Sequence, residues 1–510
     1  MRAACRLVPT DCHATPDFKA AVEDAPPSPA AVPALVAGDA VVDNPKAKVA
    51  VVALGSRGDF QPYVALCIEL RRAGYHVRCY GFKNHVAQAR QYGLEILPFD
   101  YDLELEFQTD PRLRDAMATG DFAKFLRCAC SIPWMRFGPI VDDLEAFRPD
   151  LLLGGALSRI FSVGVAEKLG IPAMWVDLQP CAASAQYPCM VAEQLSLGGC
   201  CAAPMHRLMV RMIHSTWTEP GFPEMVFREQ KLGLPAGWTA EATDALMACF
   251  CEPPWPLLVC VSPTLFPRPR DWPSAVQVVG PLIVPVDETM RRRPPQLELV
   301  KFLEAGSAPI YIGWGSMICR SAEHMTELAV RSLYETGERG IVLSGWAQLS
   351  PELLDTSRPD YAALYHYART RVLFGNDLPH EWLFPRVKLT VHHGGSGTTH
   401  CALRAGRPTI ITPVFTDQFS YRRLAVRLGV CVSADRLHSL TPSALAGAIR
   451  KASTVPMMAR AKEVGDAMRA ENGAVSAVKR IETYLRDKVR TGDWKEEFEE
   501  RFVSKLRRPV

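Results

Sequence analysis

The stretch KVAVVALGSRGDFQPYVALCIELRRAGYHVRCYGF, residues 48–82, places two different periodicities side by side. It opens with a short apolar run closed by a glycine, as in a buried parallel strand. Apolar side chains then recur at helical spacing from Val64, with Pro62 in the first turn and Gly74 as the stop. HVRCYGF is a second predicted strand. This order predicts a doubly wound α/β sheet, which binds ligands at the carboxyl ends of its strands.

The same alternation continues along the chain. DLLLGGA at 150–156 is a further predicted strand, and APIYIGWGSM at 308–317 begins a second series. The length of 510 residues also suits two domains. We therefore predict an α/β protein with two Rossmann-like domains that face each other across a cleft. The expected divisions are a disordered Ala/Pro-rich tail at 1–45, a first domain at 46–284, a linker at 285–298, a second domain at 299–477, and a charged helical tail at 478–510 that packs back on the first domain.

The composition excludes several classes of protein. With 58 basic and 55 acidic residues, no concentrated basic surface and hence no nucleic-acid partner is expected. The 16 cysteines contain no C-x-x-C pair, which favours free thiols in a reducing compartment over zinc-ribbon or redox motifs. No run approaches the roughly 20 apolar residues of a spanning helix, and the N-terminus does not resemble a signal peptide. We expect a cytoplasmic protein with no transmembrane segment, and leave peripheral membrane contact open.

The segment TVHHGGSGTTHCALRAGRPTIITPVFTDQ, residues 390–418, carries the densest chemistry. A predicted strand ends in this segment, and a loop of small residues leads into a helix. Three glycines in the loop let backbone amides approach a ligand closely, and the helix N-terminus adds its dipole and its unpaired amides. His392 and His393 lie beside the loop. Together these features predict an anion site that suits a diphosphate.

This segment resembles the donor-binding signature of family 1 glycosyltransferases, in the order HHGGSGTT, Arg404-Ala405-Gly406-x-Pro408 and Asp417-Gln418. GNDLPHEWLFPRV at 375–387 and GSRGDFQPYVALCIELRRAGYHV at 55–77 are similar to the sterol glucosyltransferases in particular. The similarity covers roughly residues 48–445. It implies the two-domain GT-B fold, a UDP-sugar donor with UDP-glucose as the first expectation, a lipophilic small-molecule acceptor such as a sterol, lipid or polyketide-like metabolite, and neither cofactor nor metal.

The resemblance also implies roles for particular residues. His392 would contact the donor diphosphate, with His393 as a second contact. The phosphates would also be bound by Gly395, Ser396, Gly397, Thr398 and Ser316. Leu378 and His380 would lie near the base and the ribose, and Asp417 and Gln418 would bind the sugar hydroxyls. Ser56 and Arg57 would face them across the cleft.

Asp59 is the predicted catalytic base. Displacement at an anomeric carbon needs a base for the acceptor hydroxyl and stabilisation of the departing nucleoside diphosphate. Asp59 follows the end of a predicted strand, although it could instead simply cap the helix that contains Pro62. The glycine-rich loop supplies the second requirement without a metal, and no D-x-D cluster occurs at a suitable metal position. We therefore expect inverting, metal-independent transfer of a hexose, with His85 as the next candidate base.

The middle of the chain departs from the sterol enzymes. Where those carry Met-Pro-Trp-Thr and then Phe-Pro-His, this chain has Gln179-Pro180-Cys181-Ala182-Ala183 and then Tyr187-Pro188-Cys189, which argues against a sterol acceptor. The apolar content of 180–256 suits a lipophilic acceptor pocket and an ordinary core equally well. Two alternatives stay open, a nucleotide-sugar epimerase of the same fold and a non-catalytic nucleotide-sugar-binding protein. A dehydrogenase is disfavoured because the first loop, G-S-R-G-D, lacks the G-x-G-x-x-G pattern.

Overall fold

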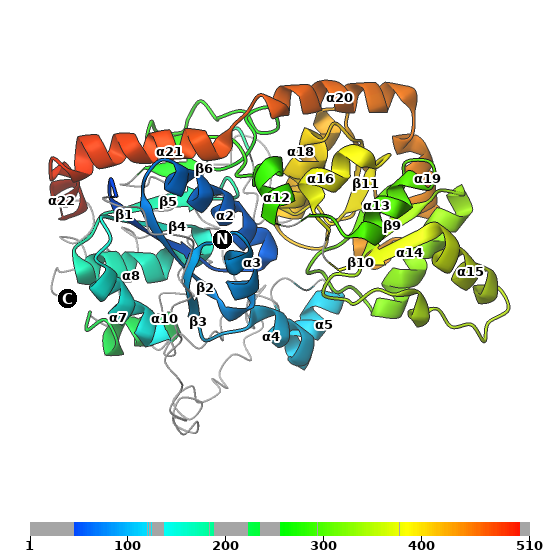
Figure 1. The fold of residues 1–510 in the computed structure, drawn as a ribbon, viewed down its shortest axis with the longest axis horizontal. Coiled ribbons are helices and arrows are strands. Elements are labelled where there is room, and N and C mark those ends of the chain that lie inside the picture. The colour runs from blue at the N-terminus through cyan, green and yellow to red at the C-terminus, as the bar shows by residue number, and fades with distance from the viewer. Residues whose placement is uncertain are drawn as a thin grey trace, which may run out of the picture.

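The computed structural model of the protein describes residues 45–119, 121, 124, 137–182, 184–187, 223–234, 256–292, 294–376 and 378–499. The predicted N-terminal tail and most of the segment 180–256 thus lie outside the described residues. Within them the chain forms two α/β units, each built on one parallel sheet (Figure 1). This arrangement confirms the predicted fold class.

The first sheet has seven parallel strands in the order β3-β2-β1-β4-β5-β6-β7. Strand β1 (Lys48–Ala53) lies in the middle, and Val49, Ala50, Val51 and Val52 have no exposed surface. A strand covered by helices on both faces needs apolar residues at every position, and this is why the opening run is continuous rather than alternating. The other strands are β2 (His76–Phe82), β3 (Glu95–Phe99), β4 (Leu151–Gly154), β5 (Ala173–Asp177), β6 (Leu257–Val259) and β7 (Val276–Val278).

The helices of the first unit connect these strands. They are α2 (Arg57–Arg72), α3 (Val86–Gln91), α4 (Leu103–Thr109), α5 (Pro111–Thr119), α7 (Gly138–Phe147), α8 (Arg159–Leu169) and α10 (Pro223–Gln230). Helix α2 turns its apolar side chains, among them Val64, Leu66 and Leu70, into the core. The chain then passes through α12 (Val286–Arg292) and α13 (Leu297–Glu304) into the second unit.

The second sheet has six parallel strands in the order β10-β9-β8-β11-β12-β13. They are β8 (Ile310–Gly313), β9 (Gly340–Leu343), β10 (Val372–Gly375), β11 (Thr390–His392), β12 (Thr409–Ile411) and β13 (Cys431–Ser433). The accompanying helices are α14 (Ala322–Thr336), α15 (Tyr361–Arg371), α16 (His380–Leu383), α17 (Ser396–Arg404), α18 (Asp417–Arg427) and α19 (Pro442–Ala452). In both sheets the chain reverses its direction of winding beside a central strand, β1 in the first and β8 in the second, where such sheets bind ligands.

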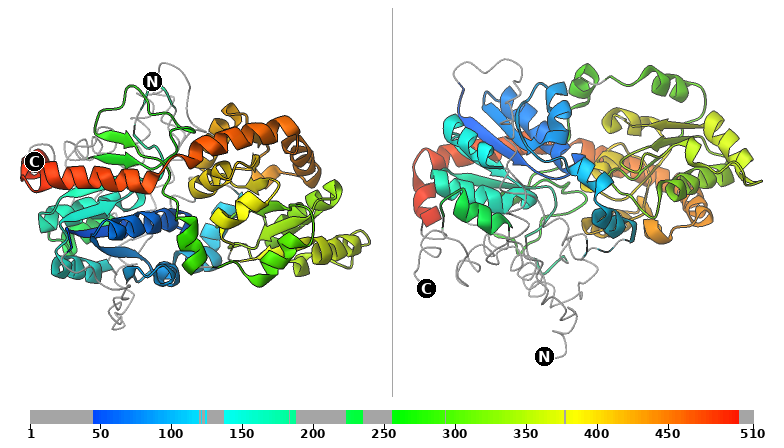
Figure 2. Two further views of the ribbon diagram at one scale, coloured as in Figure 1. Left: turned by 45° about the horizontal axis from the view of Figure 1, so that its top comes forward. Right: turned by 90° about the horizontal axis from the view of Figure 1, so that it is seen from below.

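The two units exchange helices. After α20 (Val455–Arg469) on the second unit, the chain crosses back, and α21 (Gly473–Tyr484) and α22 (Asp493–Phe498) lie along the first unit (Figures 1 and 2). Helix α21 contacts α2 and shares its apolar cluster. In the opposite direction, Phe107 of α4 packs on Trp346 of the second unit, with ring centroids 5.2 Å apart. Each unit therefore carries part of the other's core, and this fixes how the two sheets face each other.

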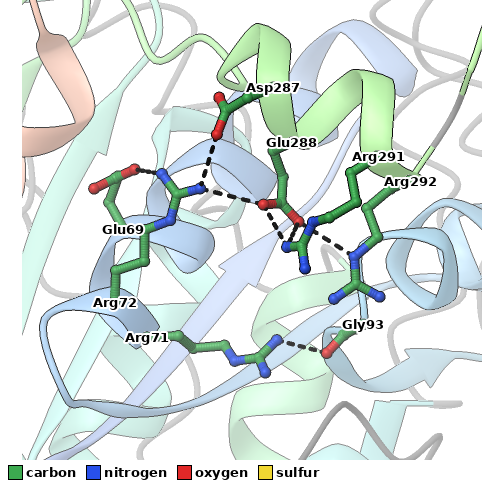
Figure 3. A network of polar contacts seen from close by, with 8 residues as sticks. All are labelled: Glu69, Arg71, Arg72, Gly93, Asp287, Glu288, Arg291 and Arg292. Carbon is green, nitrogen blue, oxygen red and sulfur yellow. Dashed lines mark hydrogen bonds and ion pairs between the residues drawn. The ribbon is translucent and has the colours of Figure 1, made fainter.

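The segment predicted to be a linker contains helix α12. Its buried carboxylate, Glu288, accepts hydrogen bonds from Arg291 and Arg292 in the last turn of the same helix and from Arg72 at the end of α2 (Figure 3). Acidic residues in the first turn and basic residues in the last turn also suit the helix dipole. Burial raises the pKa of Glu288, but the hydrogen bonds from Arg291 and Arg292 outweigh this effect and leave the pKa below its ordinary value. The charged run thus ties the connection to the first unit.

We predict that Glu288→Ala destabilises the chain. The change removes a carboxylate that three guanidinium groups share, and a hydrogen bond to a charged group contributes about 1.5–3 kcal/mol. Urea unfolding should show a lower midpoint. Asp287→Ala is the matched control, because this carboxylate is 80% exposed and 3.8 Å from Arg72, and its loss should cost less than about 0.5 kcal/mol. Equal midpoints for the two variants would contradict the anchoring role.

Candidate active site

A glycine-rich loop leads from β11 into the N-terminus of α17. A Cβ atom on Gly394 would lie 2.6 Å from Cγ2 of Ile411, and one on Gly395 would lie 2.4 Å from Nε2 of His393. Side chains are therefore excluded at both positions, and the backbone itself forms the surface of the loop. Gly395 is the N-cap of α17, and no described side chain caps this turn. The first-turn amides of α17 are thus placed to bind an anion.

His392 supports this loop from beneath. Its ring has no exposed surface. The amide of Gly394 donates to Nδ1 at 3.0 Å, so Nε2 carries the proton and donates to Oγ1 of Thr409 at 2.7 Å. Burial lowers the pKa of His392 well below its ordinary value. Because both ring nitrogens have partners within the second unit, the geometry favours a supporting role over the direct diphosphate contact that the resemblance implied.

Of the two histidines, His393 is better placed to contact a diphosphate. Its ring lies between the β11–α17 loop and the loop after β8, with Cε1 3.3 Å from where a Cβ on Gly315 would stand. Nδ1 is buried and has no hydrogen-bond partner among the described residues. Burial lowers the pKa of His393 to about 4, and a hydrogen bond with the Gly313 backbone opposes this shift, so the ring is neutral at neutral pH. Ser316 follows Gly315 in the same loop, half-buried.

Asp59 lies in the first turn of α2, where it forms half of a capping box. The backbone amide and the hydroxyl of Ser56, the N-cap, both donate to Oδ2 of Asp59, at 2.8 and 2.9 Å. Gly55 has a φ of 116°, and a Cβ there would lie 2.5 Å from that oxygen. Burial raises the pKa of Asp59, and the bonds from Ser56 oppose the rise. The same carboxylate therefore caps the helix and gains proton affinity, so its two predicted roles are compatible.

The first turns of α2 and α17 meet where the two units join. The two helices are in contact, and the carbonyl oxygen of Gly58 lies 3.9 Å from where a Cβ on Gly397 would stand. Nearby, Nε2 of Gln61 on α2 donates to Oε1 of Glu381 on α16 at 2.8 Å. Burial lowers the pKa of Arg57, and the negative charge of Glu381 opposes this shift. The structure thus brings the Ser56–Asp59 turn against the glycine-rich loop, although the two are more than three hundred residues apart in sequence.

Asp417 and Gln418 begin α18 and point in different directions. Oδ1 of Asp417 accepts a hydrogen bond from the Thr416 hydroxyl at 2.7 Å. Burial raises the pKa of Asp417 to about 6, with a further contribution from Asp59, while hydrogen bonds from Thr416 and Gln179 oppose the rise. Gln418 instead turns inward, and its Oε1 accepts from the amides of Val414 and Phe415. Asp417 therefore faces the junction, whereas the carbonyl of Gln418 organises its own loop.

Leu378 and His380 lie on the α16 side of the glycine-rich loop. Leu378 is buried in an apolar cluster with Tyr311 of β8 and Ala402 of α17. His380 forms a 2.8 Å hydrogen bond with the Tyr311 hydroxyl and stacks on Phe384, with ring centroids 4.6 Å apart. Both residues therefore lie beside α17.

Sequence reasoning missed the polar residues that join the two units beside the loop. Ser396, a predicted phosphate ligand, donates its hydroxyl to the carbonyl of Leu178 at 3.1 Å and accepts from the Tyr421 hydroxyl at 2.8 Å. His400, one turn further along α17, accepts from the amide of Ser262 at 3.0 Å. No local pattern identifies these residues, because their partners come from the other half of the chain. Thr398 lies half-buried in the same first turn.

Three further observations bear on the chemistry of the site. In the described ranges, no group of three or more His, Cys, Asp or Glu side chains could hold a metal ion. No helix in the same ranges is long and apolar enough to cross a membrane. None of the cysteines found there forms a disulfide, and Cys67, Cys79, Cys260, Cys319 and Cys431 are buried.

Two family models match the chain, one in each unit. The N-terminal domain of glycosyltransferase family 28 matches residues 49–139, and the C-terminal domain of the erythromycin biosynthesis protein CIII-like family matches residues 353–483. Among curated proteins, a sterol 3-beta-glucosyltransferase of Pichia angusta is 31% identical over 446 residues, which cover 84% of this chain and 33% of the relative. The sterol 3-beta-glucosyltransferase UGT80A2 of Arabidopsis thaliana is 29% identical over 86% of this chain and 66% of the relative. The chain thus spans about a third of the fungal relative and two thirds of the plant one.

Solved structures share the fold at low sequence identity. The kitacinnamycin glycotransferase has a TM-score of 0.58 and 19% identity, covering 87% of this chain and 100% of that one. The calicheamicin glycosyltransferase CalG4 has a TM-score of 0.58 and 15% identity, covering 86% of this chain and 98% of that one. Matches in both units therefore agree with the two facing sheets: the chain has the GT-B fold, and its two units match the models of the family 28 N-terminal domain and the erythromycin CIII-like C-terminal domain.

Proposed function

We propose that the protein transfers a hexose, glucose by preference, from a UDP-sugar to a hydroxyl of a lipophilic acceptor, with inversion and without a metal. One observation carries this proposal. The carboxylate of Asp59, with its raised pKa, lies in the helix turn that meets the anion-binding end of α17. The sterol 3-beta-glucosyltransferases that align with most of the chain support the same donor and acceptor classes.

The proposed reaction is a single displacement. Oδ2 of Asp59 is occupied by Ser56, so Oδ1 takes the proton from the acceptor hydroxyl as its oxygen bonds to the anomeric carbon. The bond from that carbon to the diphosphate breaks, and UDP leaves with the electron pair. The first-turn amides of α17 and the ring of His393 would stabilise the new negative charge. Attack opposite the leaving group inverts the anomeric carbon.

The acceptor would lie beside the segment that follows β5. Gln179 begins this segment and interacts with Asp417, so the acceptor side and the sugar side adjoin. Cys181, where the sterol enzymes carry Trp, leaves a smaller side chain in this wall. We therefore assign the acceptor to lipophilic alcohols as a class, with a sterol as one member to test. A soluble cytoplasmic setting, with peripheral access to membranes, is part of the same proposal.

An experiment without acceptor separates this proposal from the two alternatives. The pure protein is incubated with UDP-glucose and the products are analysed by mass spectrometry and NMR. Slow release of UDP and free glucose supports a transferase that uses water as a poor acceptor. An epimerised nucleotide-sugar would establish an epimerase, and saturable binding without turnover would establish a sensor.

Replacing Asp59 by Asn tests the base. Asn keeps the size and can still accept from Ser56, but it cannot take a proton, and general-base catalysis is typically worth about 10²–10⁴-fold in rate. We expect kcat to fall by that factor, while UDP affinity measured by calorimetry and the melting temperature barely change. A variant that retains turnover within about threefold of wild type would falsify the assignment, and His85, whose buried ring bonds to the Gly55 carbonyl at 2.9 Å, would be tested next.

Alanine substitutions of the two neighbouring histidines should have different effects on UDP binding and on thermal stability. A hydrogen bond to a charged phosphate is worth about 1.5–3 kcal/mol, so His393→Ala should weaken UDP binding by roughly ten- to a hundredfold with little change in melting temperature. His392→Ala leaves the Gly394 amide and the Thr409 hydroxyl without their buried partner. It should therefore lower the melting temperature first. The reverse pattern in calorimetry and thermal unfolding would restore His392 as the direct ligand.

Protonation of Asp417 should weaken donor binding at acid pH. Its pKa of about 6 is raised, so the carboxylate loses its charge as the pH falls through about 6 rather than near 4. An ionised carboxylate accepts hydrogen bonds from sugar hydroxyls better than a protonated one. The affinity of the wild type for UDP-glucose should therefore drop below pH 6, and Asp417→Asn should remove this drop. Parallel pH profiles for the binding of UDP-glucose to the wild type and to Asp417→Asn would refute this role.

A further inference from the structure

The buried imidazole of His400 is hydrogen-bonded at both nitrogens. The ring is 1% exposed and lies one turn into α17. The amide of Ser262 donates to Nε2 at 3.0 Å, and Nδ1 lies 2.7 Å from the carbonyl oxygen of Ser396. Because a backbone amide can only donate, Nε2 accepts and Nδ1 carries the proton. The ring is thus held as one neutral tautomer with both polar atoms satisfied.

The two partners of His400 belong to different units. Ser262 follows β6 in the first unit, and Ser396 is the first residue of α17 in the second. A parallel connection runs beside the ring, where the Ser396 hydroxyl donates to the carbonyl of Leu178 at 3.1 Å and accepts from the Tyr421 hydroxyl at 2.8 Å. Leu178 follows β5. The first turn of α17 is therefore bonded to the carboxyl ends of two neighbouring strands of the first sheet.

The amide of Ser262 is itself held in place. Oε1 of Glu471 accepts hydrogen bonds from the Ser262 hydroxyl at 2.9 Å and from the Thr264 amide and hydroxyl at 3.1 and 2.7 Å. Glu471 lies where the chain crosses from α20 to α21. Its carbonyl accepts from Arg404, at the far end of α17, at 3.0 Å. Both ends of α17 are thus connected to the segment that bonds His400.

We propose that His400 is a positioning residue that fixes the first turn of α17 against the strand ends of the first unit. It contacts neither donor nor acceptor, but it sets the separation between the phosphate-binding amides and Asp59. Displacement depends on such separations, since reacting groups must be held close to their productive geometry. As a statement about catalysis this inference rests on the proposed function, whereas as a statement about how the two units are held it does not.

The chemistry of the imidazole explains why an apolar side chain would not serve. Without the imidazole, the buried Ser262 amide would lose its acceptor, and it regains a hydrogen bond only if the units separate and water enters, whereas the Ser396 carbonyl still accepts from the backbone amide of residue 400 within α17. A substitution at this position therefore shifts the balance toward separated units. At about 1 kcal/mol for the one net hydrogen bond lost between the units, the arrangement seen here should become roughly fivefold less favoured.

Three substitutions test the role of His400. His400→Phe keeps a ring and removes both bonds, His400→Asn can keep the bond to Ser396 but cannot reach Ser262, and His400→Gln can supply both a donor and an acceptor. Tyr484→Phe is the matched control for removal of a buried polar atom, because the Tyr484 hydroxyl has no hydrogen-bond partner among the described residues. Small-angle scattering with and without UDP, UDP calorimetry, and the kcat and KM of glucose transfer are measured on the full chain.

We expect the radius of gyration of nucleotide-free His400→Phe to exceed that of wild type and to return toward it with saturating UDP. We expect its kcat to fall by roughly fivefold or more, with KM for the acceptor changing less. His400→Gln should recover most of the loss, and Tyr484→Phe should match wild type. Unchanged scattering and kcat in His400→Phe would overturn the proposal, as would equal losses in His400→Phe and His400→Gln.

If His400→Phe does not fold, His400→Asn decides, with a larger radius expected and an unchanged radius and kcat overturning the role. Failure of the proposed function is a separate outcome. It would appear as a wild-type protein that neither binds UDP nor transfers glucose. The nucleotide-free scattering comparison would still test whether His400 holds the two units together.

Discussion

The contact between the first turns of α2 and α17 is the constraint on which the site depends. Two helix N-termini carry partial positive charge, and bringing them together is unfavourable unless negative charge lies nearby. Asp59 supplies that charge at α2, where Ser56 holds its carboxylate. At α17 the side-chain cap is missing and a glycine occupies the N-cap position. A bound diphosphate would complete the balance, so the electrostatics that disfavours two adjacent helix N-termini favours an anionic donor.

The helices that each unit packs against the other hold this contact in one arrangement. Because α21 shares the core of the first unit and Phe107 that of the second, separating the sheets would expose apolar surface on both sides. Polar bonds then set the finer register. Ser396 and His400 connect α17 to Leu178 and Ser262, and Glu288 anchors the passage between the units. A site divided between two units requires both the apolar packing that holds the units together and the hydrogen bonds that set their register.

The sequence predicted the features that depend on neighbouring residues in the chain, and it missed those that depend on tertiary contacts. Strand β1, helix α2 and the glycine-rich loop follow from periodicity and turn chemistry within short windows. Which histidine supports the loop depends on Thr409 of the neighbouring strand, and the helix at 286–292 depends in part on Arg72, more than two hundred residues earlier. The inward turn of Gln418 and the partner of His400 are likewise tertiary facts. The sequence shows which polar residues adjoin the loop. Tertiary packing decides which of their hydrogen-bonding atoms remain available to a ligand.

The most direct test of the central claim is the configuration of the product. The pure protein would be incubated with UDP-glucose and a panel of lipophilic alcohols that includes a sterol, and any glucoside would be analysed by mass spectrometry and by the coupling constant of its anomeric proton. A single displacement between Asp59 and the α17 loop predicts a β-glucoside and one equivalent of UDP. An α-glucoside would contradict the single displacement, and UDP-glucose left unconsumed with every alcohol in the panel would contradict the account as a whole.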